Sequence, residues 1–212
     1  MDMEQTHDFE QIRPFTDEEV APAIEQLCCQ PYFVGILGYI FPGMSVSDVL
    51  VQLRTIKTID EFQQKFILPF LGNLMKNTTE GVSADGVDKL NKKGGYLFVS
   101  NHRDIILDSA LINIKLHEKG FETTEIGIGD NLLIYDWITD LVKLNKSFVV
   151  KRNLPVRQMM EASETLSAFI RQSIVNGRQN IWIAQREGRS KDGNDQTQNS
   201  VLKMFNLSGT GD

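Results

Sequence analysis

One short stretch of the chain combines a histidine with carboxylates at a spacing that suits acid–base chemistry. His102 comes after the strand-like run of residues 96–100 and Asn101, and Asp104 and Asp108 come shortly after it. A histidine side chain exchanges a proton near neutral pH, and a neighbouring carboxylate can hold its ring in one tautomer. We favour Asp108 as that carboxylate, because Asp104 is better placed to cap the helix that follows. A strand that delivers a histidine to the start of a helix predicts a site at the carboxyl edge of a sheet.

Charged residues are unevenly distributed along the chain. Residues 143–191 hold ten basic and three acidic residues, whereas residues 1–30 hold eight acidic residues and one basic residue. The net charge of −6 argues against a nucleic-acid partner. Within the helical part of the basic segment, a solvated helix face explains the charges as well as a ligand does. Outside that helix, basic residues at strand and loop positions favour an anionic ligand.

Three stretches, in this order along the chain, resemble the sequence blocks of the glycerolipid acyltransferases. They are residues 100–108 (SNHRDIILD), residues 146–152 (KSFVVKR) and residues 186–193 (REGRSKDG). The family comprises the 1-acylglycerol-3-phosphate and glycerol-3-phosphate acyltransferases, and the resemblance extends over roughly residues 82–207. Two spacings differ from the family pattern. Five residues instead of four separate His102 from Asp108, and Glu187 stands one place late in the third block.

The resemblance implies transfer of a fatty acyl group to a hydroxyl of glycerol-3-phosphate or 1-acylglycerol-3-phosphate, a reaction of phospholipid biosynthesis. The donor would be the thioester of acyl-CoA or acyl-acyl-carrier protein, with no cofactor and no metal. His102 would be the base and Asp108 its orienting carboxylate, while Arg152 and Arg189 would hold the phosphate of the acceptor. The full expected substrate-binding set is Arg103, Lys151, Arg152, Glu187, Gly188 and Arg189. No serine or cysteine elbow is evident, which favours direct attack by the acceptor hydroxyl.

A non-catalytic module that binds lipid or acyl carrier on the same fold is the alternative function. The adjacent pair Cys28 and Cys29 favours a reducing compartment, and no apolar run reaches the ~20 residues of a spanning helix. We therefore expect a cytoplasmic protein, with the inner face of the membrane as a second, peripheral location. The apolar segment 32–41 is the candidate for that membrane contact.

The elements that position the site fall into two regions. Residues 1–80 are predicted to be a helical N-terminal region, with helix starts at Thr16, Ser45 and Thr58 and a bend at Pro69. Residues 81–212 are predicted to be an α/β acyltransferase domain with a mixed sheet and helices on both faces. Its first strand is expected at 82–84 and a long helix at 156–175. A turn is expected at 192–195 and an apolar segment at 201–207. The family's next apolar strand does not follow, so we expect this domain to be truncated at its C-terminus.

Overall fold

A computed structural model describes residues 8–209 of the chain. The residues group into two compact units by their contacts. The first, which we call the helical unit, consists of Pro14–Ser83 and Leu132–Ser147. The second, the sheet unit, consists of the described residues 8–13, 84–131 and 148–209. The expected domain boundary at residue 80 remains a prediction.

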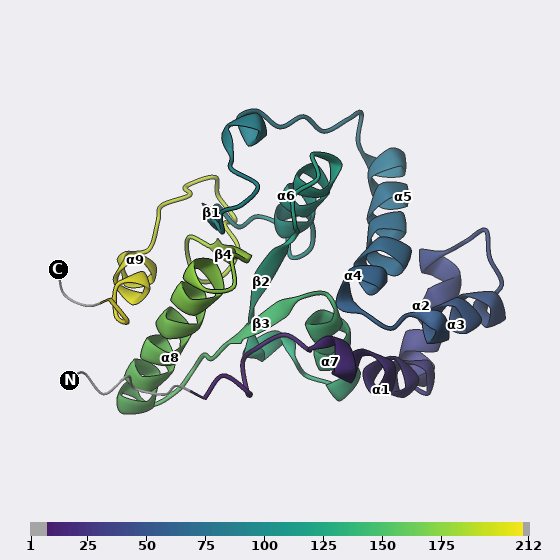
Figure 1. Ribbon diagram of the computed structural model, residues 1–212, viewed down its shortest axis with the longest axis horizontal. Coiled ribbons are helices and arrows are strands. Elements are labelled where there is room, and N and C mark those ends of the chain that lie inside the picture. The colour runs from purple at the N-terminus through teal and green to yellow at the C-terminus, as the bar shows by residue number, and fades with distance from the viewer. Residues whose placement is uncertain (1–7, 210–212) are drawn as a thin grey trace. The chain divides into compact units, whose positions relative to one another are not determined.

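The sheet unit is built on four strands in the order β1-β4-β2-β3 (Figure 1). They span Leu97–Ser100 (β1), Thr124–Gly129 (β2), Ser147–Val150 (β3) and Asn180–Ala184 (β4). Three consecutive apolar residues of the inner strand β4, Ile181, Trp182 and Ile183, are buried. Burial on both faces explains why this strand is a continuous apolar run instead of an alternating one.

The register between β1 and β4 decides where the site lies. The two strands run parallel, with Leu97 opposite Ile181 and Ser100 opposite Ala184. Their carboxyl ends therefore stop at the same level. The ladder continues one step further, since the Gln185 amide donates to the Ser100 carbonyl over 2.8 Å. The segments that begin at Asn101 and Gln185 consequently leave the sheet side by side.

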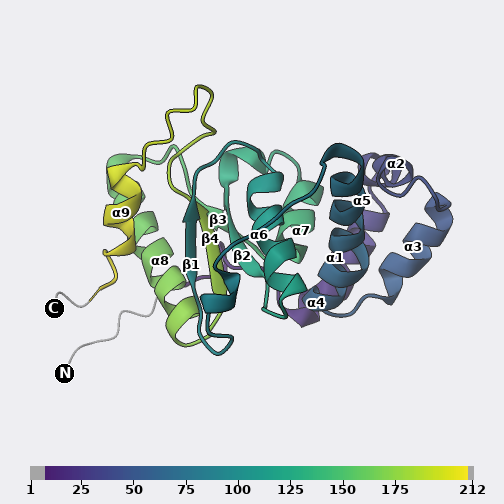
Figure 2. The ribbon, with the colours of Figure 1, turned by 90° about the horizontal axis from the view of Figure 1, so that it is seen from above.

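Helices cover both faces of the sheet, as expected. Helix α6 (Leu107–Glu118) packs against β2, and α8 (Val156–Val175) packs against β4. Figure 2 shows the strands between these two helices, with α9 (Asn199–Phe205) outside α8. The α/β class is thus confirmed. The sheet, however, is parallel and not mixed, because a helical crossover follows each of the first three strands.

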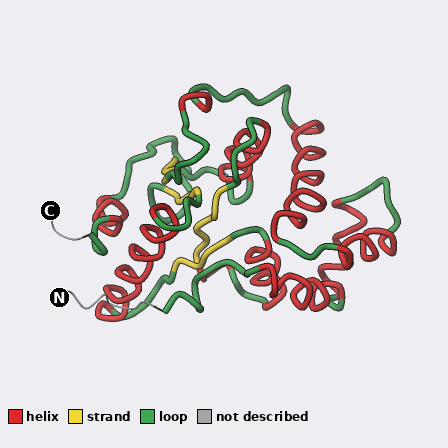
Figure 3. The backbone as a smooth tube through the Cα atoms, in the orientation of Figure 1, coloured by secondary structure: helices red, strands yellow, loops and turns green. Residues whose placement is uncertain are grey.

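The helical unit contains no strand over residues 14–83 (Figure 3). Its helices are joined by short connections and include the later helix α7. They are α1 (Asp17–Cys28), α2 (Pro31–Ile40), α3 (Val46–Thr55), α4 (Ile59–Phe62), the π-helix η1 (Gln63–Ile67), α5 (Leu68–Thr78) and α7 (Asp136–Leu144). Two further short 3₁₀ turns, η2 (Val87–Lys89) and η3 (Asp130–Leu132), complete the described elements.

All three helix starts predicted from capping residues are present. The Thr16 amide donates to the Glu19 carboxylate over 2.7 Å ahead of α1. The Ser45 hydroxyl accepts from the Asp48 amide ahead of α3, and the Thr58 hydroxyl accepts from the Glu61 amide ahead of α4. Each bond satisfies an amide that has no partner within its own helix.

Three local predictions need correction or detail. Residues 82–84 are irregular, because no neighbouring strand pairs with them. The apolar segment at 201–207 forms most of α9 and its exit turn. Pro69 lies in the first turn of α5, directly after a π-helix at Gln63–Ile67 that separates α4 from α5, and the bend at Pro69 stays a prediction.

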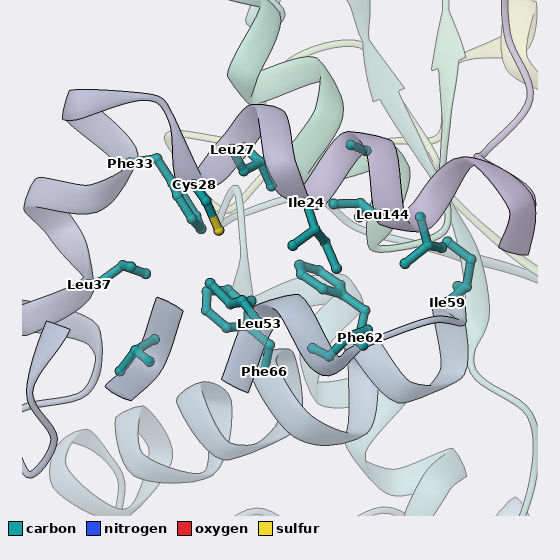
Figure 4. Packing of buried hydrophobic residues seen from close by; sticks show 14 residues of the cluster. Ile24, Leu27, Cys28, Phe33, Leu37, Leu53, Ile59, Phe62, Phe66 and Leu144 are labelled. Atoms are coloured by element: carbon teal, nitrogen blue, oxygen red, sulfur yellow. The ribbon is translucent and has the colours of Figure 1, made fainter. Parts of the chain in front are cut away.

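The helical unit is held together by an apolar cluster that Figure 4 shows from close by. Phe33, Leu37 and Phe62 are completely buried in it. The Phe62 and Phe66 rings stack with their centroids 5.1 Å apart. Leu144 at the end of α7 belongs to the same cluster, which explains why α7 groups with these helices although it lies between β2 and β3 in the sequence.

Candidate active site

The turn that follows β1 holds the predicted histidine–carboxylate pair. His102 Nδ1 lies 2.9 Å from Asp108 Oδ2, and the two side chains are 19% and 18% exposed. The same oxygen accepts the backbone amides of Arg103 at 2.7 Å and Asp104 at 3.1 Å. An oxygen that accepts from two amides suits a third donor, so we assign the ring proton to Nδ1 and the lone pair to Nε2.

Asp104, the other candidate partner of the histidine, has a different task. Its Oδ1 accepts the amides of Ile106 and Leu107, both at 2.8 Å, at the start of α6. These two amides lower the pKa of Asp104, and the charges of Arg189 and His102 lower it further. Asp104 therefore caps the helix, and Asp108 contacts the imidazole. The extra residue between His102 and Asp108 does not prevent their contact.

The second ring nitrogen of His102, Nε2, is not engaged by the protein in the part of the chain that the structure describes. The Trp182 ring on β4 meets the His102 ring edge-on, with the centroids 6.1 Å apart. Trp182 is itself fixed, since its Nε1–H donates to the Ser100 hydroxyl over 3.0 Å. The ring is therefore oriented through Nδ1 and through its contact with Trp182, and Nε2 takes no part in holding it.

The third sequence block lies in the loop between β4 and α9, beside the histidine turn. The Ser190 amide donates to the His102 carbonyl over 2.7 Å. Gln185 organises the loop, because its Nε2 donates to the Asp195 carbonyl and its Oε1 accepts from the Thr197 hydroxyl. The Glu187 amide donates to the Gln198 side chain over 2.9 Å, which closes the loop near its far end.

The second and third blocks meet through an ion pair. Arg152 Nη1 lies 2.8 Å from Glu187 Oε1, so the late position of Glu187 still brings its carboxylate to this arginine. The Arg152 amide donates to Asp130 Oδ1 over 3.1 Å, which holds the start of this segment. The Arg152 side chain lies so close to Gly129 that a Cβ there would be 2.5 Å from its Nε. Glu187 and the Arg152 backbone amide therefore hold the arginine in place, and Gly129 leaves the space that its side chain occupies.

The remaining predicted substrate-binding residues differ in how available they are. Arg103 donates through Nε and Nη2 to Asp195 Oδ2, at 2.9 and 2.6 Å, so its charge is already paired. Arg189 is exposed, and its charge acts on Asp104 in the histidine turn. Gly188 adopts a left-handed backbone with φ of 71°, a conformation that side chains disfavour. Lys151 is partly buried at the rim of a cavity.

That cavity has a volume of about 400 Å³ and lies in the sheet unit, between the ends of β3 and β4 and the helices α8 and α9. Its walls include the apolar side chains of Met159, Leu166, Val201 and Met204. Lys151, Arg152, Arg186 and Glu187 line it as well, so it combines apolar and charged walls. His102 is not among its lining residues.

Sequence reasoning missed two residues of this arrangement. Asp195 was expected only as part of a turn over 192–195, and Gln185 was not singled out. The turn itself is present, since the Asn194 amide donates to the Asp192 side chain. The Asp195 side chain reaches back to the histidine turn, and Ser190, Arg103 and Asn101 lower its pKa to about 2. The position of Gln185, directly after a buried strand, was a signal that could have marked it.

The arrangement matches a known family. Residues 81–204 match the acyltransferase family model, and the chain belongs to that family. The resemblance seen in the three sequence blocks is thereby confirmed. No curated protein matches the chain significantly.

Residues 8–209 contain neither a membrane-spanning helix nor a cluster of metal-binding side chains. None of the described helices is both long and apolar enough to cross a membrane. No group of three or more histidine, cysteine, aspartate or glutamate side chains among those residues is arranged to hold a metal ion.

Proposed function

We propose that this protein is a glycerolipid O-acyltransferase that uses a thioester donor and a phosphate-bearing acceptor. The observation that carries the proposal is the pair formed by His102 and Asp108, with Nδ1 bonded to the carboxylate and Nε2 unpartnered within residues 8–209. Membership of the acyltransferase family supports acyl transfer in general. The acceptor and the donor class are our inference from the charged residues around the pair.

The proposed reaction is a single displacement at the thioester carbonyl. Nε2 of His102 takes the proton of the acceptor hydroxyl as its oxygen attacks the carbonyl carbon. The carbon–sulfur bond then breaks, and the leaving thiolate receives a proton from the imidazolium. The products are an ester and a free thiol, and the histidine returns to its neutral form. Asp108 stabilises the imidazolium and keeps its ring aimed throughout.

The phosphate of the acceptor is proposed to bind at the exposed end of the third block. Arg189 is exposed, and its charge already acts on the histidine turn. Arg152 is paired with Glu187 through one N–H group, and a guanidinium carries five such donors, so others remain for an anion. The left-handed Gly188 next to Arg189 supports an additional role for backbone N–H groups.

Donor and acceptor assays on a histidine variant test the proposal. We expect purified wild-type protein to release thiol from acyl-CoA or acyl-acyl-carrier protein in the presence of glycerol-3-phosphate or 1-acylglycerol-3-phosphate, and to be much slower with glycerol. His102→Ala should lower kcat by about 10²–10⁴-fold, since it removes the base. The matched control is His117→Ala, an exposed histidine late in α6.

The result also decides between this function and a binding module. Wild-type protein that binds the lipid or the acyl carrier without transferring the acyl group would support the module. Equal activity of wild type and His102→Ala would remove His102 from the mechanism.

We further propose a cytoplasmic location with peripheral contact to a membrane through α2. Tyr32, Ile36 and Tyr39 lie on one face of this helix and are 75%, 38% and 88% exposed, while Phe33 and Leu37 are buried. Exposed apolar and aromatic side chains of this kind suit the lipid interface. We expect Ile36→Asp with Tyr39→Asp to reduce co-sedimentation with anionic liposomes, and Val51→Asp on α3 not to. Unchanged binding of the double variant would exclude α2 as the contact.

A further inference from the structure

A carboxylate from the third block joins both neighbours of the histidine. Asp195 Oδ2 accepts from Asn101 Nδ2 at 3.0 Å and from Arg103 Nη2 at 2.6 Å, across 94 and 92 residues of sequence. The oxygen also accepts from Arg103 Nε at 2.9 Å. One oxygen atom therefore accepts hydrogen bonds from the residue before His102 and from the residue after it.

The histidine itself is tied to the same loop through its backbone. The Ser190 amide donates to the His102 carbonyl over 2.7 Å, so three consecutive residues, 101–103, are bonded to residues 190–195. Asp108, from α6, holds the imidazole and the amides of Arg103 and Asp104. The turn is thus held from two sides, by a carboxylate that aims the ring and by a carboxylate that holds the flanking residues.

Asp195 is well fixed relative to the sheet. Its carbonyl accepts from Gln185 Nε2 at 2.9 Å, and the Gln185 amide bonds to Ser100 at the end of β1. The Asp195 side chain is 16% exposed, while the Arg103 side chain is 57% exposed. An exposed ion pair alone contributes little. Here the carboxylate is largely covered, receives donors from two side chains and is attached to both strands that lead into the site.

We infer that Asp195 is a positioning residue for acyl transfer, because it fixes the turn that carries His102 relative to the loop that carries Gly188 and Arg189. The inference rests on the proposed function. Its physical basis is that a proton acceptor displaced by about 1 Å from its substrate can lose about 10²-fold in rate. Asp195 does not touch the reacting atoms, so its effect is transmitted through Asn101 and Arg103.

The kinetic test uses Asp195→Asn, which keeps the size of the side chain and removes its charge. We expect kcat to fall by about 10–100-fold, with the KM values of donor and acceptor changed by less than about threefold. Asp192→Asn is the matched control, since Asp192 lies in the same loop and, within residues 8–209, its side chain is bonded only to the local Asn194 amide. Its kcat should equal that of the wild type.

Histidine NMR measures the positioning without any substrate. In ¹⁵N-histidine-labelled protein, assigned with His102→Ala, the Nδ1–H signal of His102 should be present in the wild type and in Asp192→Asn. In Asp195→Asn it should be broadened or lost, with an unchanged circular dichroism spectrum. If Asp195→Asn does not fold, Asn101→Ala removes one of the donors to Asp195 and should reproduce a smaller loss of the signal.

The outcomes separate this inference from the proposed function. An inactive wild type with the expected NMR difference would refute the proposed reaction and retain the positioning of His102 by Asp195. An active wild type whose Asp195→Asn variant keeps its kcat, or changes only KM, would overturn the inference. An unchanged His102 signal in Asp195→Asn would overturn it as well.

Discussion

The core of the helical unit and the site of the sheet unit are held by different kinds of contact. In the helical unit, a continuous cluster of buried side chains includes Phe33, Phe62 and Phe66, and all its members are apolar. Around the site of the sheet unit, the defining contacts are hydrogen bonds and ion pairs, such as those of Asp108, Arg152 and Asp195. Apolar burial is non-directional and scales with area, whereas hydrogen bonds fix direction. The difference indicates that burial holds the helical unit together, while directional contacts arrange the side chains of the site.

The largest predicted effect is a loss of stability from a substitution in the apolar cluster of the helical unit. Phe62 is completely buried, and Phe62→Ala should lower the free energy of unfolding by about 3–5 kcal/mol, because it leaves a cavity. Tyr39→Ala, at an aromatic that is 88% exposed, should change it by less than about 0.5 kcal/mol. Urea unfolding of both variants in a Trp182→Phe background measures the difference through Trp137 on α7 of the helical unit. Equal losses in the two variants would contradict the assignment of the core.

A smaller effect, on acceptor binding, is predicted for the glycine of the sheet unit that contacts the Arg152 side chain. A Cβ at Gly129 would lie 2.5 Å from Arg152 Nε and from Asn131 Oδ1, so Gly129→Ala must displace the arginine. We expect the KM of the phosphate-bearing acceptor to rise about tenfold, equivalent to about 1.4 kcal/mol, with kcat little changed. Steady-state kinetics with varied acceptor measure this.

A glycine of the helical unit provides the control for that prediction. A Cβ at Gly35 on α2 would meet nothing within 4 Å. Gly35→Ala should leave the acceptor KM unchanged and stabilise the protein by about 0.5–1 kcal/mol, because alanine favours the helix. An unchanged KM in Gly129→Ala would argue against a role of Arg152 in acceptor binding.

The smallest predicted effect is on the stability of the protein at acidic pH. Asp195 has a pKa of about 2, below the ordinary value of about 3.9. A depressed pKa in the folded state gives stability that is fully present above about pH 4 and is lost as the pH falls through about 2. The melting temperature of Asp195→Asn should therefore vary less between pH 4.5 and pH 2 than that of the wild type, because the variant lacks the ionisation of this one carboxyl group. Asp192→Asn should keep the wild-type slope, and identical slopes in all three proteins would refute the assigned pKa.

Local patterns explain why much of the fold was predictable. Capping residues at Thr16, Ser45 and Thr58 act within four residues, and α8 occupies the range predicted for it, Val156–Val175. A strand at 82–84 was wrongly predicted, because a strand exists only where another strand pairs with it. The parallel arrangement, likewise, follows from the crossovers and not from any one strand.

By itself, the sequence determined the family, most of the helices and strands, and the pairing of His102 with Asp108, all of which rest on neighbouring residues or on ordered blocks. Only the tertiary structure decided that Arg152 meets Glu187 and that Arg103 meets Asp195. Those contacts depend on the register that places Ser100 opposite Ala184. A shift of that register would move every residue after β4 relative to the histidine turn, and residue types alone do not encode that distance.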